Sequence, residues 1–261
     1  MGRCLKIKKE KERSHNMFTY KGKSSKEMHL RVLNDISFSS PSRDVNMIQV
    51  PGRDGDLIMD NGRFESVIRS IPCRLAPPPG TDVEQLINEI NNWLIDNGGF
   101  HEFKWNHDPE FKYLARVEGD VVSQRMLSRF GKSTIDFRLH PIKYLETSLE
   151  ESIGVTNGTV VVNPFAIDAK PIIRIVGHIP GREEDEDTII NIGGRPLRLR
   201  GITDGCIINS ETQTITSLDG RVTLFSQMRS PFPVLKPGNN QVTFSASGIQ
   251  VLITRRLGAL V

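Results

Sequence analysis

Between two strand-like segments lies the charged turn Val50-Pro51-Gly52-Arg53-Asp54-Gly55-Asp56-Leu57. Proline fixes one backbone angle, and the two glycines permit the left-handed conformations that a tight reversal needs. The flanking segments 45–50 and 64–71 have apolar residues at or near every second position, which is typical of strands. The pattern predicts a rigid turn with exposed charges and no catalytic group. It suits an ordinary solvated loop as well as a contact surface, and the candidate partner-contact residues are Arg53, Asp54 and Asp56.

The composition is that of a soluble globular protein with one large or two ordinary domains. The chain has 261 residues, of which 37% are hydrophobic and 25% are charged. Its longest apolar runs, such as residues 159–162 and 249–253, are far shorter than the roughly 20 residues of a membrane-spanning helix, so we expect no membrane anchor. The three cysteines are widely spaced, which argues against a disulfide framework and against a paired-cysteine zinc site.

The net charge of +3 is distributed unevenly along the chain. Residues 1–16 carry six Lys and Arg against two Glu, which is +4 and leaves −1 for residues 17–261. Because this basic head lacks aromatic residues and the body is nearly neutral, we expect no dedicated nucleic-acid binding. The head also lacks periodicity, which predicts either a disordered arm or a start-site artefact with Met17 as the true start. It does not resemble a secretory signal, so we expect synthesis in the cytoplasm.

Strand signals alternate with turns along most of the chain, around one convincing helix. Residues 83–94 form an apolar stripe at spacings of three and four, with Thr81 or Asp82 as the cap and a predicted end at residues 97–99. A helix among strands predicts an α+β domain with the helix packed on a sheet face.

The second half of the chain reads as an antiparallel sandwich, because short strands follow one another between Gly, Asp and Asn residues. The polar segment 141–151 suggests a boundary near residue 146, which gives domains of residues 17–146 and 147–261 and a mainly β fold class. The expected strands are residues 28–33, 45–50, 64–71, 100–105, 113–117, 133–139, 171–177, 188–192, 197–199, 206–209, 213–216, 241–244 and 248–253.

No motif in the sequence establishes catalytic or cofactor chemistry. Gly131-Lys132-Ser133 lacks the upstream glycine of a phosphate-binding loop and precedes a strand, where that motif requires a helix. The acidic run at residues 183–187 lacks the interspersed glycines of a calcium loop. We therefore predict no catalytic residue, no cofactor and no metal. Two less favoured alternatives stay open: a cation at the acidic run, and a metal site formed by His101, His107, Asp108 and Glu110.

Several different segments follow one another in a characteristic order across the two halves of the chain. In the first half they are Phe18-Thr19-Tyr20-Lys21-Gly22-Lys23-Ser24-Ser25, the turn Pro51-Gly52-Arg53-Asp54-Gly55, the helix ending in Trp93-Leu94, Arg129-Phe130-Gly131-Lys132-Ser133-Thr134-Ile135-Asp136-Phe137 and Pro141-Ile142-Lys143-Tyr144. In the second half they are Pro171-Ile172-Ile173-Arg174-Ile175-Val176-Gly177, Gly205-Cys206-Ile207-Ile208-Asn209-Ser210-Glu211 and Leu235-Lys236-Pro237-Gly238-Asn239-Asn240. Over residues 17–261 this order resembles the distal tail protein (Dit) family of long-tailed bacteriophages, especially those that infect Gram-positive bacteria.

The resemblance implies a structural hub without catalytic activity. In such a protein the N-terminal domain forms a hexameric ring at the end of the tail tube, DNA passes through the ring without being specifically bound, and a galectin-like C-terminal sandwich projects outward. The implied partners are the tail tube protein, the tail-associated lysin or tip protein, and receptor-binding or baseplate proteins. The implied location is the virion tail, with assembly in the host cytoplasm.

Two other functions stay open at the level of the sequence. One is a carbohydrate-binding adhesion module that contacts the host cell wall through the sandwich. A shared fold does not transfer sugar binding, however, and both tryptophans, Trp93 and Trp105, lie outside residues 147–261. The other is a tail-associated hydrolase, for which the sequence offers no paired-carboxylate or zinc signature.

Overall fold

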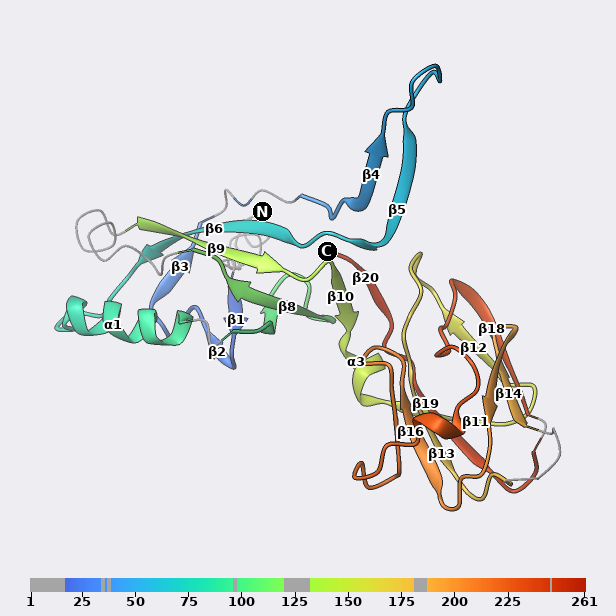
Figure 1. Cartoon of the computed structure of the whole chain (residues 1–261). Helices are drawn as coiled ribbons and strands as arrows, with labels where there is room; N and C mark the ends of the chain where they lie inside the picture. The colour runs from blue at the N-terminus through green and yellow to red at the C-terminus, as the bar shows by residue number, and fades with distance from the viewer. Residues whose placement is uncertain are drawn as a thin grey trace, which may run out of the picture. The chain divides into compact units, whose positions relative to one another are not determined.

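An antiparallel sheet with a helix on one face dominates the first half of the chain (Figure 1). The computed structural model describes residues 17–33, 36, 39–95, 98–119, 132–180, 187–244 and 246–261. The basic head and residues 183–186 of the acidic run therefore lie outside the described residues. In the described part of the chain, seven strands of this nine-stranded sheet lie in the order β2-β1-β7-β8-β9-β6-β3. They are β1 (Phe18–Tyr20), β2 (Lys23–Ser24), β3 (Leu30–Val32), β6 (Val67–Leu75), β7 (His101–Trp105), β8 (Phe111–Val117) and β9 (Lys132–Leu139).

Alternation along these strands puts one face of the sheet in the core. On β6 every second residue from Val67 to Leu75 is buried, and this inward set includes Arg69, which is 3% exposed. Aromatic rings fill the centre of the core, where Phe18 stacks on Phe103 and meets Phe137 edge to face. Such ring pairs favour stacked or edge-on geometry and stabilise beyond the area that they bury.

Helix α1 (Val83–Leu94) covers this inward face, as its apolar stripe predicts. Asp82 is the cap, because its side chain accepts hydrogen bonds from the amides of Glu84 and Gln85. The helix ends at Leu94, before the glycines that were expected to terminate it. Trp93 Nε1 donates to the carbonyl oxygen of Tyr20 at 2.8 Å, which ties the helix to the sheet.

The second half of the chain forms a two-sheet sandwich. One sheet has the order β11-β19-β13-β16-β17 and the other β12-β18-β14-β15, and the pairs within each sheet are antiparallel. Inward-facing aliphatic residues of both sheets make a separate core. The strands are β11 (Ser152–Val155), β12 (Val160–Asn163), β13 (Ile172–Val176), β14 (Thr188–Ile192), β15 (Arg195–Leu199), β16 (Gly205–Asn209), β17 (Thr214–Thr216), β18 (Gly238–Phe244) and β19 (Gln250–Thr254). The predicted mainly β fold class is confirmed.

The chain divides into two units after Lys143. The first runs to Lys143 and includes Val261, whose amide donates to the carbonyl of Pro141 at 3.0 Å, and the second is Tyr144–Leu260. The sequence boundary near residue 146 lies three residues further along. Strand β10 (Ile142–Leu145) pairs with β20 (Gly258–Leu260).

The sequence prediction did not include strands β11 and β12, and two further details of it were wrong. Residues 64–71 are not one strand, because β5 (Leu57–Phe64) ends at Phe64 and β6 begins at Val67. Between them the amide of Glu65 donates to the carbonyl oxygen of Ser42. The helix at residues 83–94 is joined by a short helix α3 (Glu146–Glu150) and a 3-10 turn η1 (Phe225–Gln227). Both are too short to show an apolar period in the sequence.

Candidate assembly surface

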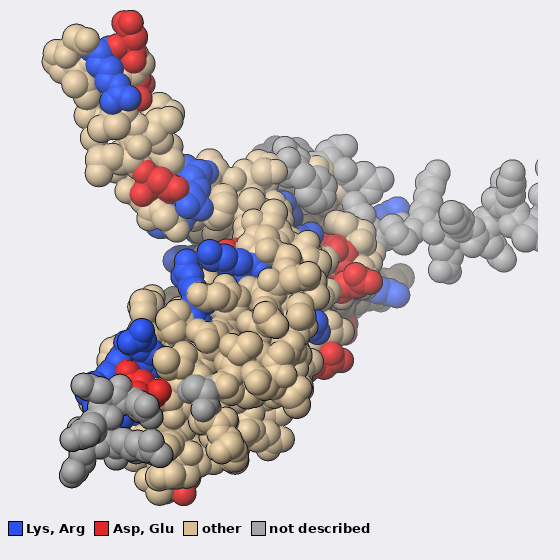
Figure 2. Space-filling model, turned by 90° about the vertical axis from the view of Figure 1, so that its right-hand side faces the viewer, with Lys and Arg blue, Asp and Glu red and all other residues tan. Residues whose placement is uncertain are grey.

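The charged turn caps a hairpin that stands apart from the main sheet of its unit (Figure 1). Strands β4 (Arg43–Ile48) and β5 (Leu57–Phe64) pair antiparallel with each other and form a separate two-stranded sheet. Figure 2 shows this hairpin with a neutral surface between the charges of its base and those of its turn.

The chain reverses direction at this turn, as its glycine residues predict. Gly52 and Gly55 have φ angles of +80° and +78°, a region that side chains other than glycine rarely adopt. The amide of Arg53 donates to the carbonyl of Val50 at 3.1 Å. All residues of the turn from Gln49 to Asp56 are exposed, so the predicted exposed turn is present.

Ion pairs hold the base of the hairpin. Arg43 Nη2 lies 2.8 Å from Asp60 Oδ2, and the Arg43 guanidinium lies over the ring of Phe64. On the other side Asp44 accepts from Asn61 Nδ2 at 2.9 Å and pairs with Arg63. The hydrogen bond from Arg43 holds the pKa of Asp60 below its usual value, and the bond from Asn61 does the same for Asp44. These contacts set the register of the two strands where they leave the domain.

The distal half of the hairpin is apolar on both faces. Because paired residues share a face, one face carries Met47 and Ile58, while the other carries the pair Ile48 and Leu57 together with Met59. Met47, Ile58 and Met59 are 64%, 61% and 52% exposed. An isolated two-stranded hairpin is marginally stable in water, and contiguous exposed apolar side chains mark an interaction surface. We define these five residues as the apolar tip.

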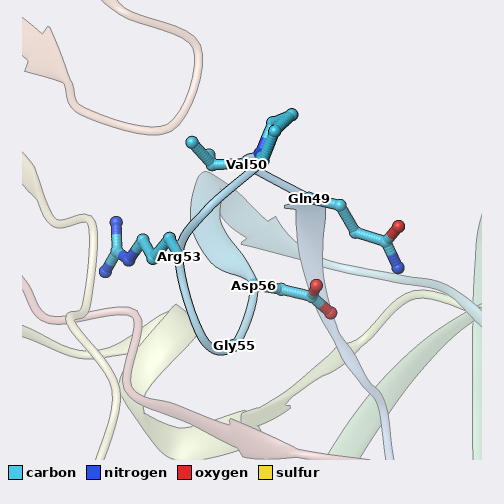
Figure 3. Close-up of a pocket in the computed structure, with 6 residues that line it drawn as sticks. Gln49, Val50, Arg53, Gly55 and Asp56 are labelled. Atoms are coloured by element: carbon cyan, nitrogen blue, oxygen red, sulfur yellow. The ribbon is translucent and has the colours of Figure 1, made fainter.

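The sequence prediction placed its candidate contact residues in the turn next to the apolar tip and did not name the side chains of the apolar tip. Arg53 and Asp56 line a hollow of the turn together with Gln49, Val50, Pro51 and Gly55, and their side chains point to opposite sides (Figure 3). Asp54 is exposed but does not line the hollow. The apolar tip was missed, although Met47-Ile48 and Leu57-Ile58-Met59 are consecutive apolar residues, a pattern that no one-sided strand shows.

The described residues contain no group of three or more His, Cys, Asp or Glu side chains arranged to hold a metal ion. Asp108 instead bonds to Tyr113 and Lys143. Lys132 and Ser133 lie on strand β9, and Gly131 is outside the described residues. The thiols of Cys73 and Cys206 are free and buried, and burial raises the pKa of each to about 12. No helix in the described part of the chain is long and apolar enough to cross a membrane.

Comparison with known proteins finds similarity to solved structures. No protein-family profile and no curated protein sequence matches the chain. Among solved structures, the chain is similar to the Dit protein (gp 19.1) of SPP1, presented as a paradigm of the hub adsorption apparatus in phages that infect Gram-positive bacteria. The TM-score is 0.67 at 17% sequence identity, and the match covers 91% of this chain and 98% of that chain. The chain therefore has the fold of a phage distal tail (Dit) protein.

Proposed function

We propose that this protein is a structural hub at the distal end of a long phage tail. Six copies form a ring that joins the tail tube to the tail tip or baseplate and lets DNA pass. The observation that carries this proposal is the match to a hub protein over 98% of that protein's length, which includes both halves of this chain. The role is structural and non-enzymatic, in the virion tail, after assembly in the host cytoplasm.

The apolar tip supports a role in assembly. An exposed strand pair with apolar residues on both faces gains stability when a partner covers it, because both faces and both edges are otherwise open to water. A ring of identical copies repeats one heterologous contact, and its rotation closes the assembly. We assign the hairpin to this contact or to the contact with the neighbouring tail proteins. Residues Arg53, Asp54 and Asp56 then lie at the rim, where charge determines specificity more than affinity.

Native mass spectrometry together with light scattering tests the proposal. We expect the wild-type protein to form a six-fold ring or a pair of such rings, alone or after addition of tail-tube protein. Replacement of Met47 and Ile58 by aspartate should abolish the ring, since it places two charges in the apolar contact. Val222→Asp is the matched control, because Val222 is a similarly exposed apolar residue, 56% exposed, in the second unit.

The fold of each variant is checked by tryptophan fluorescence. Both tryptophans of the chain are buried in the first unit, so their emission reports on the unit that carries the hairpin. A wild-type protein that stays monomeric at high concentration and with tail-tube protein present would contradict the hub proposal. A ring that survives the Met47 and Ile58 replacements would show that the apolar tip has another role.

Asp54→Arg tests the charged rim separately. An exposed charge rarely stabilises a fold by more than about 1 kcal/mol, so the variant should stay folded while its assembly weakens. Circular dichroism that shows loss of fold would mean that the turn has only a structural role.

A further inference from the structure

Three basic side chains lie in register across adjacent strands of the main sheet. Arg31 on β3 pairs with Arg74 on β6, and Arg74 pairs with Lys132 on β9. All three are exposed, and their neighbours along the strands, Leu30, Val32, Cys73 and Leu75, are buried in the core. Since side chains alternate between the faces of a sheet, the three cations point away from the core. We call Arg31, Arg74 and Lys132 the basic row.

The basic row carries an energetic cost that its own strands do not offset. Like charges directly opposite each other on neighbouring strands destabilise the pair. Within the described residues no ion pair involves any of these three side chains, and the next acid along β9 is Asp136, four residues away. An edge strand is often protected by a charge, but that explains only Arg31, because β6 and β9 lie inside the sheet.

The opposite layer of the same domain has the complementary charge. Helix α1 packs on the inward face of the sheet (Figure 1), and its outer side exposes Glu84 and Glu89 beside the capping residue Asp82. The helix contains no Lys or Arg, and its other exposed side chains are the amides Gln85, Asn88 and Asn92. One face of the domain thus supplies acids and acceptors, and the other supplies cationic donors.

We propose that the basic row binds the acidic helix face of a second copy of this chain. Two different faces of one domain then meet in a head-to-tail contact, the kind that closes into a ring when its rotation allows. This inference rests on the proposed hub function and names a second contact, separate from the hairpin.

The dimensions of the two faces agree. Neighbouring strands are about 4.8 Å apart, so the row spans roughly 10 Å from Arg31 to Lys132. Glu84 and Glu89 are five residues apart, which is about 7.5 Å along the helix axis and about 140° around it, so they flank the outer side of the helix. The long Arg and Lys side chains cover the remaining difference, and Arg can bind a carboxylate through two parallel hydrogen bonds.

Charge reversal on one face at a time tests the contact. The sheet-face variant combines Arg31→Glu with Arg74→Glu, and the helix-face variant combines Glu84→Lys with Glu89→Lys. Each variant alone would bring like charges together, so its ring should dissociate at a protein concentration at least about tenfold higher than that of the wild type in low salt. An equimolar mixture should restore the ring, because every contact in an alternating ring pairs opposite charges. Native mass spectrometry of mass-labelled copies should show three of each variant per hexamer.

The outcomes separate this inference from the hub proposal. A wild-type monomer contradicts the hub function itself. If the wild type forms a ring and each single-face variant forms it equally well, this contact is wrong and the hub function is unaffected. The same holds if mixing the two variants does not restore a ring that each variant alone has lost. If a reversed variant fails to fold by tryptophan fluorescence, neutralisation by Arg31→Gln, Arg74→Gln and Lys132→Gln replaces it. A folded neutral variant that forms the ring as the wild type does in low salt also overturns the contact.

Discussion

At the scale of single residues, a polar cluster in the first unit links the end of that unit to its sheet. Lys143 Nζ lies 2.6 Å from Asp108 Oδ2 and 3.3 Å from the Tyr113 hydroxyl, which itself bonds to Asp108. Burial raises the pKa of Asp108, but the hydrogen bonds from Lys143 and Tyr113 outweigh that effect and hold it below its usual value. The ionised form of Asp108 therefore stabilises the folded unit.

Asp108→Asn should lower the free energy of unfolding of the first unit by about 1–2 kcal/mol at pH 7, since it leaves a half-buried Lys143 without its counter-charge. The pKa of Asp108 is lower in the folded state than its unfolded value of about 4. Its contribution is thus complete above that value and is lost as pH falls through the folded-state pKa. Urea unfolding followed by tryptophan fluorescence should show the wild type and the variant converging below pH 4.

Asp56→Asn in the exposed turn is the control for this measurement and should leave the stability unchanged. A wild-type advantage over Asp108→Asn that stayed constant from pH 7 to pH 2 would show that the carboxylate charge does not contribute.

A glycine in the sandwich gives a second prediction at this scale. Gly205 has a φ of +121°, and a Cβ atom there would lie 2.1 Å from the carbonyl oxygen of Ile175 on the neighbouring strand. Gly205→Ala should therefore destabilise the second unit by about 3 kcal/mol or more, through strain and overlap together. Gly220→Ala is the matched control, because Gly220 also has a positive φ but faces open space, so only the smaller cost of strain applies.

The two units can be followed separately in this experiment. During urea unfolding, circular dichroism should show that Gly205→Ala loses strand signal at a lower urea concentration than the wild type. The tryptophan transition of the first unit should occur at the same urea concentration in both proteins. Equal effects of the two substitutions would contradict the role given to the close approach of Ile175.

At the scale of elements, the hairpin should be the least protected strand pair of the isolated chain. Strand β6 is buried on one face and paired on both sides, whereas β4 and β5 pair only with each other. Hydrogen exchange of dilute protein should thus be at least about 100-fold faster in residues 43–64 than in β6. On assembly the hairpin amides should become protected and those of β6 should not change. Slow exchange of the hairpin in the monomer would show that it needs no partner.

The sequence predicts the helix and most of the sandwich strands, because each has one face in a core and therefore a clear period, but it did not predict β11 and β12. The hairpin shows the limit of that reasoning. Met47-Ile48 and Leu57-Ile58-Met59 do not alternate with polar residues, because the distal hairpin is apolar on both faces. The strand predicted from Phe64 to Ile71 is in fact the end of β5 and the start of β6. Pairing across the sheet is also hidden, so Arg31, Arg74 and Lys132 look unrelated until the register brings them into one row.

At the scale of the whole molecule, the apolar tip and the basic row predict that ring assembly depends on two different forces. Added salt screens the charge contact, because the Debye length falls from about 10 Å at 0.1 M to 3 Å at 1 M. Sulfate also strengthens apolar burial, as it is excluded from protein surfaces. At equal ionic strength the wild-type ring should therefore dissociate at lower protein concentration in sodium sulfate than in sodium chloride. The sheet-face and helix-face variants should keep this sulfate effect but respond to chloride in the opposite sense, because added salt screens the repulsion between their like charges. Light scattering across both salt series measures this directly, and identical behaviour in the two salts would exclude an apolar contact from the ring.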